Sequence, residues 1–211
     1  MKIGLMLSVA ALGVAAVAIA AMPLQDAKAK GKPDDKAAGA PMDSAKMMEA
    51  WAKAGAVGEQ HTKLAKCAGT WNMVVKYWMP GMEKGPPMES KGTATREAIL
   101  GGRFLVEKVK GDMGPMGAFE GFGVLGYNNI TKQYDNVWMD SQGTGMAASH
   151  GTAGADGTVT MTGEYDDPMG GKVKFRSVMK NVSDNEQLFE MYETMGPAPE
   201  RKAMEITYKR A

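Results

Sequence analysis

The sequence predicts an all-β protein, a ten-strand antiparallel up-and-down barrel preceded by one or two short α-helices. From Gly69 onward, apolar and polar residues alternate with the period of two that is typical of β-strands. Clusters of Gly, Asn and Asp, which favour turns, recur between the alternating segments. The connections are too short for crossover helices, so neighbouring strands must be antiparallel. A single meander of this length has exposed edges unless it closes, and we therefore expect a barrel.

The first 29 residues have the pattern of a signal peptide. Lys2 provides a positive start, an apolar stretch runs from Ile3 to Ala21, and Ala27-Lys28-Ala29 offers a cleavage site. We therefore expect the protein to be exported, periplasmic or secreted, without a membrane span after cleavage. Because the apolar stretch approaches the roughly 20 residues that cross a bilayer, a retained N-terminal anchor is the alternative.

Residues 30–42 are predicted to be a flexible linker, because they carry charges, Gly and Pro and few apolar groups. The 4 Trp, 6 Tyr and 5 Phe all follow this segment. The folded part therefore starts near Asp43. We expect residues 43–68 to form helices packed on the barrel, and residues 69–211 to form the barrel domain.

Two short helices fit the segment before the barrel. Asp43 or Ser44 can cap the first helix, which Gly55 ends. The second spans Glu59–Ala68 and ends at Gly69. The apolar face of the first helix consists of Met47, Met48 and Trp51.

Ten strands are predicted after Gly69, and the first one shows the alternation clearly, with Trp71, Met73, Val75 and Tyr77 on one face. The predicted strands are Thr70–Met79, Glu89–Ala98, Arg103–Lys110, Ala118–Tyr127, Gln133–Asp140, Gly145–Gly151, Thr158–Tyr165, Lys172–Asn181, Gln187–Thr194 and Lys202–Lys209. The methionines expected in the core are Met73, Met139, Met161, Met179, Met191 and Met204.

The two ends of such a barrel differ in composition. Connections after even-numbered strands are short, polar and built from Gly, Asn and Asp, as tight turns require. Four of the five connections after odd-numbered strands carry Met beside Gly or Pro. Because a meander gathers odd connections at one end, we expect a closed even end and an open odd end lined with thioethers, which we call the mouth.

Most of the chain from about His61 to Arg210 resembles DUF1579, a family of bacterial domains of unknown function. The matching segments are His61-x-x-Leu64, Gly69-Thr70-Trp71, Leu100-Gly101-Gly102-Arg103-Phe104-Leu105, Phe119-Glu120-Gly121-Phe122-Gly123, Gly126-Tyr127-Asn128-Asn129, Trp138-Met139-Asp140-Ser141, Gly143-Thr144, Phe189-Glu190-Met191-Tyr192 and Glu205-Ile206-Thr207-Tyr208-Lys209-Arg210. The sequence departs from the family pattern at Asn128 and at His150. The resemblance implies a fold and brings no established activity.

A looser likeness is to the lipocalin-like, or calycin, barrels. Those proteins open their first strand with Gly-x-Trp and place a basic residue from the end of the chain over that Trp. Gly69, Trp71 and Arg210 take these positions here. The resemblance implies a cation–π contact at the closed end, where the first and last strands meet.

The densest polar and aromatic group, at the end of the fifth predicted strand, contains Trp138, Asp140 and Thr144. It either caps a turn or places Trp138 and Asp140 in a cavity wall. The mouth methionines either pack the loops together or contact a ligand, because Met is flexible and apolar. The candidate ligand-binding residues are Trp138, Asp140, Thr144, Met82, Met113, Met116, Met169 and Met195.

Several function classes are disfavoured. Lys+Arg 25 against Asp+Glu 24 leaves no excess of positive charge for nucleic acid. The single Cys67 excludes an internal disulfide and a Cys-based zinc cluster. His61 and His150 are the only histidines, and neither a nucleophile elbow nor a phosphate loop is present. We therefore predict no catalytic residue and no cofactor. Arg96, Arg103 and Glu190 are candidates for a buried charge network, which requires pairing.

The preferred hypothesis is therefore a protein that binds a small apolar molecule through the mouth. A non-catalytic structural or interaction domain with a filled barrel is the alternative. Copper(I) binding by the loop residues Met82, Met113, Met116 and Met169 and an enzyme using Asp140 rank lower, since thioethers prefer soft metals but loop spacing fixes no geometry. The sequence leaves the oligomeric state and the ligand open.

Overall fold

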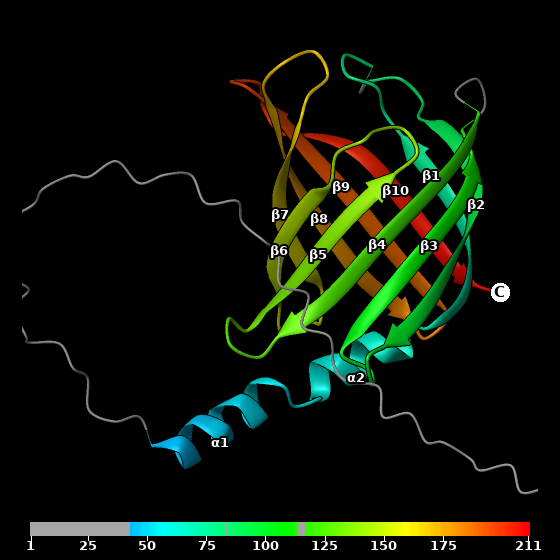
Figure 1. Cartoon of the computed structure of the whole chain (residues 1–211). Coiled ribbons are helices and arrows are strands. Elements are labelled where there is room, and N and C mark those ends of the chain that lie inside the picture. Colours follow the sequence, from blue (N-terminus) through cyan, green and yellow to red (C-terminus); the bar gives the residue numbers. More distant parts are fainter. Residues whose placement is uncertain (1–42, 83, 114–116) are drawn as a thin grey trace, which may run out of the picture. The chain divides into compact units, whose positions relative to one another are not determined.

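The computed structural model describes residues 43–82, 84–113 and 117–211, so the predicted signal peptide and linker lie outside the described residues. Helices α1 (Ser44–Ala54) and α2 (Glu59–Lys66) precede the strands (Figure 1). The strands are β1 (Gly69–Tyr77), β2 (Met88–Ile99), β3 (Phe104–Asp112), β4 (Ala118–Asn128), β5 (Gln133–Asp140), β6 (Ala147–Ala153), β7 (Val159–Asp166), β8 (Lys172–Ser183), β9 (Glu186–Met195) and β10 (Arg201–Arg210).

The ten strands form a closed antiparallel barrel in which each strand pairs with its sequence neighbours and β1 pairs with β10. The predicted fold class is confirmed. β5 has the predicted bounds, and β6 differs most, since it starts two residues later than expected, at Ala147. The glycine-rich connection that precedes β6 is correspondingly longer and includes Met146.

Helix α2 lies across the end of the barrel where the even-numbered strands turn (Figure 1). Leu64 is buried there against Leu105, Tyr134 and Met161. His61 is 4% exposed, its Nδ1 accepts from the Gly58 N–H at 3.1 Å, and its Nε2 donates to the Tyr127 carbonyl at 3.0 Å. These contacts seal this end of the barrel, which we call the closed end.

Helix α1 differs from the expectation that both helices pack on the barrel. Its residues are exposed except Ala54, which is half-buried, and Trp51 is 72% exposed. Asp43 caps its start, and the carbonyls at its end accept from barrel turns, with Gly55 bound by Arg103 and Ala54 by Asn129. Within the described residues, α1 is therefore held to the barrel at its C-terminal end.

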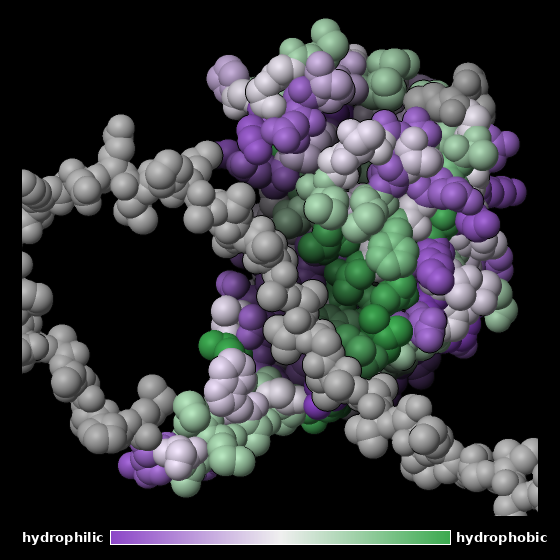
Figure 2. All heavy atoms as spheres, viewed as in Figure 1, coloured by the Kyte–Doolittle hydropathy of each residue, from purple (hydrophilic) through white to green (hydrophobic). Residues whose placement is uncertain are grey.

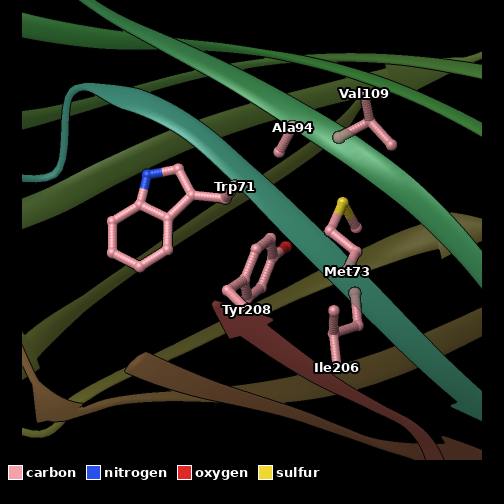
Figure 3. Close-up of a cluster of buried hydrophobic side chains, with 6 residues drawn as sticks. All are labelled: Trp71, Met73, Ala94, Val109, Ile206 and Tyr208. Carbon is pink, nitrogen blue, oxygen red and sulfur yellow. The ribbon is translucent and has the colours of Figure 1, made fainter. Parts of the chain in front are cut away.

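Alternate side chains of each strand point into the barrel. The main buried cluster contains Trp71 and Met73 from β1, Ala94 from β2, Val109 from β3 and Ile206 and Tyr208 from β10 (Figure 3). Further inward-facing apolar side chains pack against this cluster and stay half-buried, namely Val75, Phe119, Trp138, Met179, Phe189 and Met204. Since a filled interior would bury them, the barrel retains space inside.

The prediction that Met139 lies in the core is wrong. Tyr134 is buried inside the barrel, so the period of two also turns Trp138 and Asp140 inward and Met139 outward. Met139 pairs with Phe122 on the outer surface of β4. Two adjacent side chains of a strand point to opposite faces, and here the indole takes the inner position.

Candidate ligand-binding site

All the connections that follow odd-numbered strands lie at the end of the barrel opposite α2 (Figure 1). Because β6 starts at Ala147, the connection after β5 also carries a methionine, Met146. Several thioether side chains there are largely exposed, including Met82 at 57%, Met146 at 70% and Met169 at 92%. This end is the mouth that the strand parity predicts.

The mouth contains a pocket of about 250 Å³ between the ends of β1, β7, β8, β9 and β10. Half of its lining residues are aromatic residues or methionines. The lining residues are Tyr77, Trp78, Met79, Pro80, Tyr165, Asp167, Pro168, Val173, Met191, Glu193, Met195, Arg201, Ala203 and Met204.

A cluster of polar side chains is built into the pocket wall. The Tyr165 hydroxyl donates to Glu193 Oε1 at 2.8 Å, and Arg201 Nη2 donates to Glu193 Oε2 at 2.5 Å. Arg201 Nη1 also donates to the carbonyl of Trp78 at 2.8 Å. The Glu193 side chain is 8% exposed and that of Arg201 15%, so this ion pair is well shielded from water.

Burial raises the pKa of the Tyr165 phenol, and the hydrogen bond to the Glu193 carboxylate raises it further. Tyr165 therefore remains a hydrogen-bond donor throughout the physiological range. Both carboxylate oxygens of Glu193 already accept hydrogen bonds. The side chains of Tyr165, Glu193 and Arg201 therefore hold one another in place. The pocket therefore presents apolar walls to a ligand, and its polar groups are already hydrogen-bonded to one another.

Of the predicted ligand-binding residues, Met195 lines this pocket. Trp138 and Asp140 lie on the inner wall of β5, where Trp138 Nε1 donates to Asp140 Oδ2 at 2.8 Å. Asp140 Oδ1 also accepts from the Gln142 N–H at 2.9 Å, so the carboxylate caps the turn as well. Asp140 therefore caps the turn, as one of the two interpretations predicts, and the same carboxylate also holds the inward-facing indole.

The remaining predicted residues are dispersed over the connections at the mouth. Thr144 is exposed in the connection after β5, and Met82 and Met169 are exposed on two other connections. Met113 is half-buried, and Met116 lies outside the described residues. The described ones among these residues lie on connections at the mouth and do not line the pocket.

The sequence analysis missed Tyr165, Glu193 and Arg201. The orientation of Glu193 could have been predicted from the sequence. Phe189 and Met191 face inward, so the alternation along β9 places Glu193 inward as well. Arg201 could not be placed by counting, because the β9–β10 register shifts between Lys202 and Met204. Such a bulge changes which side chains face inward.

A second charged cluster lies toward the closed end. Arg96 Nε donates to Glu107 Oε1 at 2.7 Å, and its Nη1 also contacts Gln187 Oε1. Gln187 Nε2 lies 3.2 Å from Cys67 Sγ, and that thiol is half-buried. Of the three residues expected in a buried charge network, only Arg96 is buried.

The other two members are elsewhere. Arg103 is exposed and binds the Gly55 carbonyl, whereas Glu190 pairs with Lys202 at 2.6 Å on the outer surface. The alternation along a strand predicts which way a charged side chain points only when the first residue of the strand is known. Within the described residues, no group of three or more His, Cys, Asp or Glu side chains is arranged to hold a metal ion.

The outer surface of β3, β4 and β5 carries an apolar patch (Figure 2). A shallow hollow of about 450 Å³ is lined there by Phe122 and Met139 together with Lys108, Lys110, Glu120 and Ser141. Val109, Gly121 and Asp140 also contribute to its lining, and this hollow shares no lining residue with the mouth pocket.

The fold and site define a ten-strand closed β-barrel with one sealed end and one open end that contains a pocket. The chain belongs to the DUF1579 family, described as proteins of unknown function, whose family model matches residues 56–210. None of the curated proteins compared with it matches. In the part of the chain that the structure describes, no helix is long and apolar enough to cross a membrane.

Among solved structures, the chain is similar to the crystal structure of Rv2717c from M. tuberculosis. The two share 12% sequence identity with a TM-score of 0.50, over 74% of this chain and 99% of that one. This likeness concerns the fold.

Proposed function

We propose that this protein binds a small, largely apolar molecule in the pocket at the mouth of its barrel. The observation that carries the proposal is the pocket itself, about 250 Å³ lined by aromatic and thioether side chains around a buried ion pair. Ligand pockets of proteins commonly have volumes of about 300–1,000 Å³, with apolar walls and a few placed polar groups. At about 250 Å³ the pocket lies just below this range, so it suits a small ligand.

The composition of the rim supports the same proposal. Methionine side chains are flexible and polarisable, so they adapt to the shape of an apolar guest. Met79, Met82, Met146 and Met169 are exposed around the opening although water offers them no favourable contact. An exposed group of large apolar residues in a soluble domain commonly marks a binding surface.

A non-catalytic interaction domain with a filled barrel is the alternative. The half-buried state of inward-facing residues such as Phe189 and Met179 favours an open interior. The two hypotheses differ in one measurable property, the saturable uptake of a small apolar molecule by the purified protein.

The test is a fluorescence titration with the neutral apolar dye N-phenyl-1-naphthylamine. We expect saturable binding with one site per chain. Met195→Trp should weaken it at least tenfold, because Met195 lines the pocket and a larger side chain there occupies the ligand volume. Absence of saturable binding would contradict the proposal and favour the filled barrel.

Met169→Trp is the matched control. Met169 lies on the mouth as well, but it is 92% exposed and does not line the pocket among the described residues. The dye affinity of this variant should stay within twofold of the wild type. Equal effects of the two substitutions would show that the dye binds the rim and not the pocket.

We further propose that the protein is exported, on the strength of Lys2, the apolar stretch Ile3–Ala21 and the site at Ala27-Lys28-Ala29. N-terminal sequencing of protein recovered from the periplasm or medium should then start near Lys30. Recovery of the full-length chain in the membrane fraction would instead indicate a retained anchor.

A further inference from the structure

The indole of Trp138 lies on two glycines of the neighbouring strand. A Cβ atom built on Gly121 would be 2.5 Å from Cζ2 of Trp138, and one on Gly123 would be 3.1 Å from its Cε3. These indole atoms are at opposite edges of the six-membered ring, and Gly123 is the direct register partner of Trp138. The ring therefore spans the space that two missing side chains leave, flat against the barrel wall.

Asp140 holds the indole in this position. Its Oδ2 accepts from Trp138 Nε1 at 2.8 Å, and its Oδ1 is held by the Gln142 N–H at 2.9 Å. A ring that is fixed by a hydrogen bond at one edge and by glycines beneath it has little freedom to turn. Trp138 faces inward and packs against the main buried cluster, yet it remains half-buried, so part of the residue is accessible.

The platform lies two strands away from Tyr165, a residue of the mouth pocket. Trp138 pairs with Ala147 on β6, and Ala148 pairs with Glu164 on β7, which brings Ala147 beside Tyr165 in the register. Tyr165 lines the pocket. Ala147, which has a small side chain, therefore lies between Trp138 and Tyr165 in the register.

The same device recurs on the other side of Tyr165. A Cβ atom on Gly163 would be 2.7 Å from Cζ of Phe175, its direct register partner. Glycines opposite aromatic residues let the rings lie along the wall and keep the interior wide.

We infer that the inner face of Trp138 is a stacking platform for a planar aromatic ring system that carries no negative charge. This inference rests on the proposed ligand-binding function and specifies its ligand class. Stacking between an indole and a planar ring adds to the affinity beyond simple burial. The Asp140 carboxylate at the edge of the platform disfavours an anionic ring, because like charges repel strongly where water is scarce.

The first experiment compares ligands on the wild-type protein. N-phenyl-1-naphthylamine should bind at least tenfold more tightly than its anionic 8-sulfonate derivative, which has the same rings. Displacement of the neutral dye by dodecanol, a flexible aliphatic alcohol, measures the binding of an apolar ligand that cannot stack on the indole. Equal affinities for the neutral and the sulfonated dye would overturn the charge requirement.

The second experiment changes the platform. Gly121→Ala places a methyl group within 2.5 Å of the indole and forces the ring into the interior, so the affinity for N-phenyl-1-naphthylamine should fall at least tenfold. Gly126→Ala is the matched control on the same strand, because its Cβ would meet Phe104 at 2.6 Å, and Phe104 is 38% exposed on the outer surface. The control should bind the dye within twofold of the wild type.

Trp138→Leu keeps the test decisive if Gly121→Ala does not fold. It should weaken the binding of the naphthylamine at least tenfold and that of dodecanol less than threefold. It should also reduce the quenching of protein fluorescence by bound dye, to which Trp78 in the pocket lining still contributes. Equal losses for both ligands, or no loss for either, would overturn the platform while leaving the apolar pocket intact. If neither ligand binds to the wild-type protein, the proposed function fails and the platform with it.

Discussion

The guanidinium carbon of Arg210 lies 4.4 Å from the centroid of the Trp71 ring. The contact joins the first and last strands of the barrel, because Trp71 is in β1 and Arg210 ends β10. Arg210 Nη1 also donates to the Ala68 carbonyl at 2.8 Å, and Nη2 donates to the Lys66 carbonyl at 3.0 Å. A Cβ atom on Gly69, whose φ is +126°, would be 2.8 Å from this Nη1, so glycine is required there. The lipocalin-like resemblance implied this arrangement.

Arg210→Ala should lower the free energy of unfolding by about 2 kcal/mol, because it removes a cation–π contact and two hydrogen bonds to helix-end carbonyls. Lys209→Ala is the control, since its side chain is 67% exposed. That variant should stay within about 0.5 kcal/mol of the wild type. Urea unfolding of both variants measures the difference, and similar values for the two would contradict a closing role for Arg210.

The buried pair of Arg96 and Glu107 should be strongly coupled. Their side chains are 4% and 19% exposed, and Arg96 also lies 4.4 Å from the centroid of the Tyr208 ring. Removing one member leaves the other charge buried, which costs about 3–5 kcal/mol. We therefore expect Arg96→Leu alone to destabilise the protein more than Arg96→Leu combined with Glu107→Leu. A double-mutant cycle in urea checks this expectation, and additive effects would exclude the coupling.

Burial raises the pKa of the phenols of Tyr165 and Tyr208 above the ordinary value of about 10. In the unfolded chain these phenols ionise first, so the stability they confer is present below pH 10 and is lost as the pH rises above it. Tyr165→Phe should therefore weaken the fall in unfolding free energy between about pH 9 and pH 11.

The absorbance of tyrosinate near 295 nm provides the second measurement for these phenols. Below about pH 11 the folded protein and the Tyr165→Phe variant should give the same absorbance change, because Tyr165 does not ionise in the folded state. A smaller change in the variant would show that Tyr165 titrates like a free tyrosine, which contradicts the burial of its hydroxyl beside Glu193.

On the outer surface, a hydrogen bond from Lys202 lowers the pKa of the Glu205 carboxyl, although partial burial opposes the shift. A lowered folded-state pKa contributes stability above the unfolded value near 4.5 and loses it as the pH falls through the folded value. Glu205→Gln should reduce the loss of stability between about pH 5 and pH 3. Glu97→Gln, on the exposed outer side of β2, is the control and should leave that loss unchanged.

Two features of the candidate site could be predicted from the sequence: the face of a strand on which a side chain lies, and the end of the barrel at which a connection lies. Alternation along β5 places Trp138 and Asp140 on one face, and the count of strands places the methionine-bearing connections at one end. Arg201 was not predictable, because its orientation depends on the bulge in β10. Neither was the role of Gly121 and Gly123, since a glycine gives no sign of which ring lies over it.

The amino-acid sequence by itself determined the barrel, its strand order and the difference between its two ends, because local alternation and short turns leave a meander one way to close. The tertiary structure alone decided which thioethers enter the pocket, how Glu193 meets Tyr165 and Arg201, and where Trp138 rests. Those contacts join residues that are distant in the sequence, and their geometry depends on strand register and bulges, which the packing of the whole barrel fixes.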